Sequence, residues 1–282
     1  MLRNGLYIIA TPIGNLRDIS ARALEILREA DIIACEDTRV AKKLFSLLGL
    51  PQNKKFIKYE DHSEEKQAQN LIDLIDEGNA VALVSDAGSP LISDPGYKLV
   101  RKCREQDVYV TAVPGACAVV TALQLSGLPT NRFMFAGFIP NKDKARADLF
   151  NELKNIDTTL IFYETAPRLV KTLEQAALSF CSREIAVARE LTKMYEEVIS
   201  GSFTEILAHF MQNEPRGEFV LMIAPPTEKE YGIEDVRDIL QKRLCETSLK
   251  TAVKEICTQY NLNKNEVYAL ALELKDEQLS QR

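Results

Sequence analysis

The sequence predicts two α/β domains followed by a helical tail. Through the first 226 residues, short apolar runs alternate with amphipathic stretches, a pattern typical of mostly parallel sheets with helices on both faces. The chain is interrupted at Ser126–Thr130, where we place the boundary between the domains. From Glu234 onward the pattern is helical. We therefore expect domains at 1–128, 129–226 and 227–282.

The first domain is expected to alternate strictly between strands and helices. Buried-strand runs predict strands at Leu6–Ala10, Ile32–Cys35, Phe56–Tyr59, Ala80–Val84 and Val108–Val113. Amphipathic spacing predicts helices at Ser20–Ala30, Arg39–Leu48, Ser63–Glu77, Asp94–Gln106 and Ala116–Leu125. The third of them is expected to be capped at Ser63-Glu64-Glu65 and to stop at Gly78. The predicted start of the fourth helix is based on Asp94–Pro95, a pair typical of an N-cap followed by proline at the first helical position.

The second domain repeats the alternation, and the tail does not. Helices are expected at Asp143–Leu153, Pro167–Leu178 and Phe203–Phe210, and strands at Thr158–Tyr163, Glu184–Ala188, Glu196–Ser200 and Glu218–Ala224. In the tail, Leu249–Tyr260 and Asn265–Leu274 form two helices joined by a tight turn. This arrangement fits a helix-turn-helix unit or a helical hairpin packed on the body, and the sequence leaves both open.

Composition is that of an ordinary globular protein. Of 282 residues, 46% are apolar and 27% are charged. No apolar run approaches the roughly 18 residues of a membrane helix, and no signal-peptide pattern precedes Leu6, so we expect a cytoplasmic protein. The six cysteines form no CxxC pair and the histidines are His62 and His209. We expect reduced core cysteines, no metal site and no Ser–His–Asp triad.

The loops that leave strands are the expected ligand sites, because ligands of open α/β sheets bind beyond the carboxyl ends of the strands. Ala10–Leu16 contains neither a GxGxxG nor a P-loop pattern, so dinucleotide and P-loop phosphate binding are not supported. Cys35–Arg39 brings two carboxylates and an arginine to a strand exit. Those residues fit either a functional cluster or a helix cap by Asp37 or Thr38.

Two further loops are rich in small residues. Val84–Gly96 combines glycines, hydroxyl groups and aspartates, which lets the backbone approach a ligand closely. Ala112–Ala118 leaves room for a flat ring at a helix N-terminus, or for close packing of helix on strand. In the second domain, charged groups follow strands at Tyr163–Arg168 and Arg189–Lys193 and precede one at Arg216–Glu218. Each alone is typical of a solvated ion-pair set.

Five of these segments carry a family resemblance. They are Tyr7–Leu16, Cys35–Arg39, Ser85–Pro90, Val113–Ala116 and Arg189–Lys193. In this order and spacing they resemble the tetrapyrrole-methylase superfamily, and more narrowly its ribosomal branch, the RsmI-type 16S rRNA ribose 2′-O-methyltransferases. The resemblance runs from about Leu6 to Pro226, with a family-like helical tail beyond. It implies two α/β domains with S-adenosylmethionine in the cleft between them, and a homodimer.

The resemblance also implies which residues bind the cofactor. They are Pro12, Ile13, Gly14, Asp86, Gly88, Ser89, Pro90, Gly115, Ala116, Cys117, Tyr163, Leu191, Ala224 and Pro225. This chain departs from the pattern at Asp86-Ala87-Gly88, where corrin and porphyrin methylases have Gly-Asp-Pro, and this favours the ribosomal branch. Cys117 stands where serine or threonine is more usual.

The implied reaction is methyl transfer to the ribose 2′-hydroxyl of a cytidine in the decoding centre of 16S rRNA, within the small ribosomal subunit. Candidate catalytic residues are Glu36, Asp37, Glu190 and Lys193, and candidate RNA contacts are Arg39, Lys42, Arg168, Arg189, Lys250, Lys254 and Lys264. Two alternatives stay open. One is a methylase of a tetrapyrrole or of a protein residue, and the other is a non-catalytic S-adenosylmethionine-binding module of ribosome assembly.

The net charge of −6 predicts weak binding to bulk RNA, since non-specific affinity depends on lysines and arginines brought to phosphates. Contact with one folded target requires only a local basic rim. We expect that rim at Arg39, Lys42 and Lys43, at Lys142, Lys144 and Arg146, and at the tail lysines.

Overall fold

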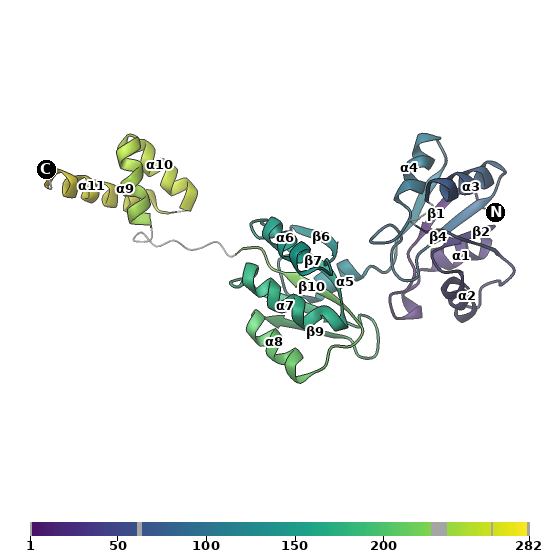
Figure 1. The fold of residues 1–282 in the computed structure, drawn as a ribbon. Coiled ribbons are helices and arrows are strands. Elements are labelled where there is room, and N and C mark those ends of the chain that lie inside the picture. The colour runs from purple at the N-terminus through teal and green to yellow at the C-terminus, as the bar shows by residue number, and fades with distance from the viewer. Residues whose placement is uncertain (1, 61–63, 227–235, 261, 281–282) are drawn as a thin grey trace. The chain divides into compact units, whose positions relative to one another are not determined.

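The computed structural model describes residues 2–60, 64–226, 236–260 and 262–280. The chain divides into two compact units, Met1–Pro226 and Thr227–Arg282. The first unit holds two five-stranded sheets, and the second holds helices (Figure 1). The predicted α/β class with a helical tail is confirmed. The boundary at residue 128 stays a prediction.

The first sheet is parallel throughout, in the order β3-β2-β4-β1-β5. Its strands are β1 (Gly5–Ile9), β2 (Ile32–Cys35), β3 (Lys55–Lys58), β4 (Ala80–Val84) and β5 (Val110–Val113). Its helices are α1 (Ala21–Glu29), α2 (Thr38–Leu47), α3 (Glu64–Asp76) and α4 (Tyr97–Glu105), with a short 3-10 helix η1 (Leu16–Asp18) after β1. Because all strands run the same way, the loops after β1, β2, β4 and β5 leave from one edge.

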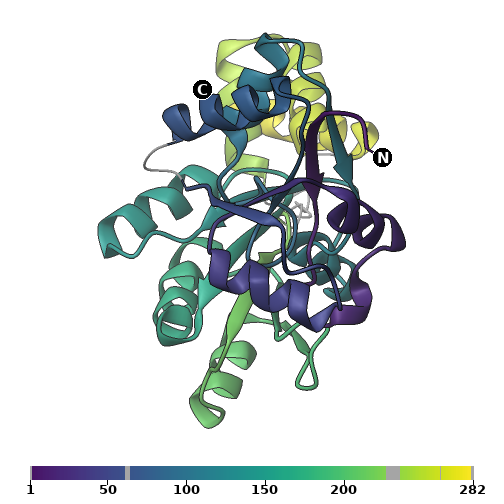
Figure 2. The same ribbon diagram turned by 90° about the vertical axis from the view of Figure 1, so that its right-hand side faces the viewer.

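Alternation along the strands explains why both faces are covered. In β1, the Ile9 side chain packs with Leu27 of α1 and Phe45 of α2 on one face of the sheet. Side chains at alternate positions of β1 point to the opposite face. There Leu6 packs with Leu71 of α3. Figures 1 and 2 show the helices on both sides of these strands. Nearly continuous apolar runs are typical of strands buried on both faces.

The second sheet has the order β6-β7-β10-β8-β9. Its strands are β6 (Phe133–Phe138), β7 (Thr159–Thr165), β8 (Ile185–Arg189), β9 (Glu197–Gly201) and β10 (Glu218–Ile223). Only β6 and β7 pair in parallel among them, and the other neighbours are antiparallel. The helices α6 (Asp143–Leu153), α7 (Ala166–Phe180) and α8 (Phe203–Gln212) share one core with this sheet (Figure 1), and α5 (Ala118–Leu125) packs on its opposite face.

Two sequence predictions were wrong here. The strand β6 was not predicted, and α4 does not start at Asp94–Pro95. Its N-cap is Gly96, with φ of 137°, so the helix begins at Tyr97. A Cβ at residue 96 would lie 2.9 Å from Leu91 Cδ1, so the tight turn, rather than the local capping pattern, sets the start of the helix.

The second unit contains α9 (Arg237–Glu246), α10 (Leu249–Tyr260) and α11 (Lys264–Ser280). It has a core of its own, in which Leu240, Val253 and Leu270 each come from a different helix. Ser248 accepts a hydrogen bond from Thr251 N–H at the start of α10. No helix in the described part of the chain is both long and apolar enough to cross a membrane.

Candidate functional site

The loops after β1 and β4 are joined by a two-residue bridge. Thr11 N–H donates to Gly88 O at 2.8 Å, and Gly88 N–H donates to Thr11 O at 3.1 Å. The Thr11 side chain is buried, and its hydroxyl donates to Ser85 O at 3.3 Å. Residues 85–88 are therefore fixed to the end of the first strand.

The loop after β5 joins the same group. Ser89 donates from its hydroxyl to Ala116 O at 3.2 Å. Gly88 has φ of 80°, a conformation that side chains rarely adopt, and a Cβ there would lie 3.2 Å from Ile13 Cγ2. The loops after β1, β4 and β5 are therefore joined to one another.

These loops border a cavity of about 260 Å³ within the first unit. Its wall combines loops of the first half with strand residues of the second half. From the first half come Ile13, Asp86, Ala87, Gly88, Ser89, Ile92, Ser93, Asp94, Cys117 and Ala118. From the second half come Phe138, Tyr163, Glu164, Thr165, Ala188, Glu190, Leu191, Lys193, Glu218, Phe219 and Val220.

Half of the residues expected to bind the cofactor lie in this wall. They are Ile13, Asp86, Gly88, Ser89, Cys117, Tyr163 and Leu191. The others, Pro12, Gly14, Pro90, Gly115, Ala116, Ala224 and Pro225, are not among the wall residues in the described part of the chain. Gly14 lies against a wall residue, because a Cβ there would sit 2.5 Å from Lys193 Cγ, and a Cβ on Gly115 would sit 2.9 Å from Ala10 Cβ. Both glycines allow loops to pack closely at the cavity.

Of the candidate catalytic residues, Glu190 and Lys193 meet in the cavity wall. Lys193 Nζ lies 2.9 Å from Glu190 Oε1. Glu190 has φ of 48° and Thr192 has φ of 65°, both in the left-handed region. Of the five described non-glycine residues with positive φ, four lie in the two loops that flank the cavity, at Leu91, Ser93, Glu190 and Thr192. Such a concentration of backbone strain is typical of functional sites.

The other two candidates, Glu36 and Asp37, lie outside the wall. Asp37 is the N-cap of α2 and accepts hydrogen bonds from Arg39, with Arg39 Nη2 at 2.6 Å from Asp37 Oδ2. These bonds hold the pKa of Asp37 well below its usual range, which makes it a weak proton acceptor. The structure therefore gives Asp37 the capping role that the sequence left open.

Asp86 connects Asp37 to the cavity. Its Oδ1 accepts a hydrogen bond from Asp37 N–H at 3.3 Å. Desolvation beside the cavity raises the pKa of Asp86, and the nearby charge of Asp37 acts in the same direction. Of these two neighbouring carboxyl groups, Asp86 in the wall is the stronger proton acceptor, because its pKa is raised and that of Asp37 is lowered.

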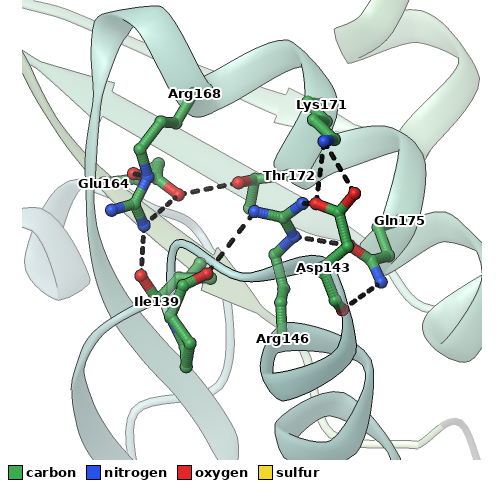
Figure 3. A network of polar contacts seen from close by, with 9 residues as sticks. Ile139, Asp143, Arg146, Glu164, Arg168, Lys171, Thr172 and Gln175 are labelled. Atoms are coloured by element: carbon green, nitrogen blue, oxygen red, sulfur yellow. Dashed lines mark hydrogen bonds and ion pairs between the residues drawn. The ribbon is translucent and has the colours of Figure 1, made fainter.

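Two of the candidate RNA-contacting arginines, Arg189 and Arg168, are paired with carboxylates of the same chain. Arg189 is paired with Glu197, with Nε at 2.7 Å from Oε2. Arg168 lies against the fully buried Glu164, with Nε at 2.9 Å from Oε1, and also donates to Ile139 O (Figure 3). Each of these two arginine side chains is 26% exposed. Their contact with RNA stays a prediction.

The expected basic rim was wrong at Arg146. This side chain is 1% exposed and lies in the network of Figure 3, where it donates to Asp143 at 2.6 Å and to Gln175 at 2.5 Å. The helix α6 turns residue 146 toward the core. The remaining rim residues are exposed, namely Arg39, Lys42, Lys43, Lys142 and Lys144 in the first unit and Lys250, Lys254 and Lys264 in the second.

Several wall residues were missed as site residues by sequence reasoning. Asp94 had been assigned to a helix cap, and Phe138 belongs to the unpredicted strand β6. Glu218 was noted only within a charged segment before a strand. A strand pattern in Phe133–Phe138 was available, but the glycine at 137 and the nearby prolines concealed it.

Comparisons with known proteins agree with the architecture. Residues 5–207 match the family described as Tetrapyrrole (Corrin/Porphyrin) Methylases, and residues 232–275 match the RsmI C-terminal HTH domain. A protein of Erythrobacter litoralis named "Ribosomal RNA small subunit methyltransferase I" is 48% identical over 274 residues, which is 97% of this chain and 96% of that protein. A protein of Rickettsia prowazekii with the same name is 44% identical, over 96% and 97% of the two chains. A crystal structure of diphthine synthase shares the fold at 16% identity, with a TM-score of 0.61 over 78% of this chain and 89% of the other.

Proposed function

The chain belongs to the tetrapyrrole methylase family and also matches the RsmI C-terminal HTH domain over residues 232–275. We propose that it methylates 16S rRNA of the small ribosomal subunit. It moves the methyl group of S-adenosylmethionine to the ribose 2′-oxygen of a cytidine in the decoding centre. The observation that carries the proposal is full-length similarity, tail included, to relatives named as small-subunit rRNA methyltransferases. The protein acts in the cytoplasm, where these subunits are.

The side chains of the cavity wall support S-adenosylmethionine as the ligand. Ile13, Leu191 and Val220 offer an apolar surface for a flat ring. Asp86 and Glu190 offer carboxylates to a positively charged ligand. The N-cap of α5, Cys117, makes no side-chain capping hydrogen bond, and Cys117 and Ala118 at the start of that helix line the cavity.

When bound, S-adenosylmethionine supplies an activated methyl group, which is the demanding part of the chemistry. The chain contributes orientation and proton transfer. We propose that a carboxylate of the wall accepts the proton that the ribose 2′-hydroxyl loses when its oxygen takes the methyl group. The ion pair with Lys193 holds the Glu190 carboxylate in place. The Lys193 side chain is 35% exposed, which leaves it accessible to a phosphate of the substrate.

The alternative substrates are less well supported. The departure from Gly-Asp-Pro at Asp86-Ala87-Gly88 and the helix-turn-helix tail both favour RNA over a tetrapyrrole or a protein residue. A non-catalytic module would have no use for the strained Glu190–Lys193 loop in the wall.

We also propose that the chain forms a homodimer through α5 and β6. Val120 and Leu125 of α5 and Phe133 of β6 are 45%, 48% and 46% exposed. Phe133 shares a strand face with Phe135, which packs against the same core as α5. An exposed apolar strip beside an edge strand is typical of an interface. Phe133→Asp is expected to give a monomer in analytical ultracentrifugation, and Leu178→Asp, at another exposed apolar position, to leave the dimer intact.

The test of the activity uses the full chain, tritiated S-adenosylmethionine and small subunits that lack the modification. Alkaline hydrolysis and mass spectrometry of the labelled rRNA locate the methyl group, because a methylated 2′-oxygen blocks cleavage of its linkage. A label on one cytidine at its 2′-oxygen supports the proposal. A label on the base, on ribosomal protein, or on neither would overturn it.

Variants test the assignment within the cavity. Glu190→Gln and Lys193→Met are expected to lower kcat/KM at least tenfold. Glu174→Gln, an exposed carboxyl group on α7, serves as the matched control and should match wild type. Full activity of both cavity variants would show that the reacting centre lies elsewhere.

A further inference from the structure

An exposed aromatic side chain in the cavity wall has no part in the function as described so far. Phe138 ends the edge strand β6, is 55% exposed and lines the cavity. Among the described wall residues, the only other strongly exposed large apolar side chain is Ile92, at 42%. Because Phe138 is a wall residue of the cavity, its exposed ring offers an apolar surface to a molecule bound there.

A β-bulge turns Phe138 into the cavity. Along β6, Phe135 pairs with Ile161 and Phe138 pairs with Tyr163, so three steps on β6 match two on β7. The extra residue puts Phe138 on the same sheet face as Phe135 and Tyr163, which strict alternation would not do. Gly137 has φ of 72°, in the left-handed region that favours glycine. The backbone of β6 is thus shaped to present this ring.

Tyr163 holds the ring in place. The centroids of Phe138 and Tyr163 are 5.3 Å apart at an interplanar angle of 65°, an edge-to-face contact. Phe135 contacts Tyr163 in the same manner, at 4.7 Å and 60°. A half-exposed ring fixed by an aromatic neighbour is a ready platform for a planar ligand.

We infer that Phe138 is the stacking platform for the base of the target nucleotide. This inference rests on the proposed function. Sequence-specific recognition of RNA targets single-stranded segments, whose unstacked bases are bound on aromatic side chains. Phe138 is a binding residue for the base, and it makes no contact with the transferred group.

The polar side chains around the platform suit cytosine. Asp94 and Glu218 line the same cavity. Their negative charges lie close enough to Tyr163 to contribute to the rise of its pKa, whose main cause is desolvation. The exocyclic amino group of cytosine donates hydrogen bonds, which a carboxylate can accept. Uracil has a carbonyl oxygen at the same position, which cannot donate to a carboxylate.

The test measures methyl transfer by the full chain to small subunits that lack the modification. For Phe138→Ala we expect kcat/KM for the subunits to fall roughly 5-fold to 100-fold, as loss of one stacked base predicts. The Kd for S-adenosylmethionine, measured by calorimetry, should stay within twofold of wild type. Phe138→Leu keeps apolar bulk without a ring and should resemble Phe138→Ala, whereas Phe138→Tyr should resemble wild type. Leu178→Ala, at an exposed apolar position outside the wall, is the control.

Two results would overturn the inference. One is a kcat/KM for Phe138→Ala within twofold of wild type while the wild-type chain is active. The other is an equal loss of S-adenosylmethionine affinity, which would make Phe138 a cofactor contact. Failure of the proposed function is distinct, since the wild-type chain itself would then transfer no methyl group to the subunits.

Discussion

The backbone of Gly217 lies against the carboxylate of Glu190. A Cβ atom at residue 217 would overlap with Oε1 of Glu190, the oxygen that pairs with Lys193. Gly217 also has φ of 87°. A position 27 residues further along the chain thereby fixes where the Glu190 carboxylate sits in the cavity wall.

Gly217→Ala is therefore expected to displace Glu190 and to lower kcat/KM for methyl transfer at least tenfold. Gly78→Ala is the matched control, because Gly78 has φ of 100° with no atom within 4 Å of the added Cβ. Both variants carry a similar backbone cost of about 1 kcal/mol. Equal activity of the two variants would contradict a role of Gly217 in positioning Glu190.

Asp86 and Asp37 should change stability in opposite directions with pH. The pKa of Asp86 is raised in the folded chain, so its ionised form opposes folding at neutral pH and this penalty disappears as pH falls toward the unfolded pKa. The pKa of Asp37 is lowered, so its ionised form favours folding above the unfolded pKa, and that contribution is lost as pH falls. Both effects are screened by solvent.

We accordingly expect Asp86→Asn to have a Tm at or above that of wild type at pH 7, and Asp37→Asn to have a lower one. Asparagine keeps the capping ability at position 37, so this variant isolates the charge. Thermal unfolding at pH 7, near pH 4 and near pH 2 checks this. The difference for Asp86→Asn should shrink by pH 4, whereas the difference for Asp37→Asn should persist at pH 4 and shrink only below it, because the pKa of Asp37 is lowered. The same sign for the two variants would refute the assignment.

Arg146 is expected to act on stability and not on RNA affinity. Arg146→Ala removes a buried side chain and its bonds to Gln175 and Asp143, at a cost of about 2–3 kcal/mol in the free energy of unfolding. Urea unfolding measures that cost. Lys144→Ala, on the exposed side of α6, should change stability by less than about 0.5 kcal/mol. A loss of subunit affinity for Arg146→Ala without loss of stability would restore it to the basic rim.

Cysteine alkylation should follow burial. Desolvation raises the pKa of Cys35 to about 12 and that of Cys103 to about 11, and both side chains are buried. Cys181 and Cys245 are exposed. Iodoacetamide at neutral pH should therefore label Cys181 and Cys245 first, as followed by peptide mass spectrometry. Early labelling of Cys35 would show that the first sheet opens readily.

The buried strands could be predicted from the sequence because burial on both faces leaves a continuous apolar run, as in Ala80–Val84. The strand β6 could not, since Gly137 interrupts the run and its bulge defeats the period of two. The start of α4 failed for a related reason, because Gly96 adopts a turn that overrides the capping pattern at Asp94. Local patterns report on a segment's own preferences, not on contacts made later in the chain.

The residues of the candidate site also fall into those that the sequence marks and those that it does not. Asp86, Gly88 and Leu191 were found because motifs mark them, and they lie in the wall. Phe138 and Glu218 reach the wall only through the pairing of β6 and β10 with β7. Burial of Arg146 likewise depends on which side of α6 meets the core. No spacing within one segment reports these relations between strands and helices.

The position of β10 in the second sheet determines when that sheet can form during synthesis of the chain. Although β10 is the last strand in sequence, it lies in the middle of the second sheet, between β7 and β8. Until Ile223 has left the synthesising ribosome, β7 and β8 keep unpaired inner edges, and Glu218–Val220 are missing from the cavity wall. Translation must therefore pass this strand before the second sheet and the cavity wall can be complete, so the cavity forms only after most of the protein has emerged.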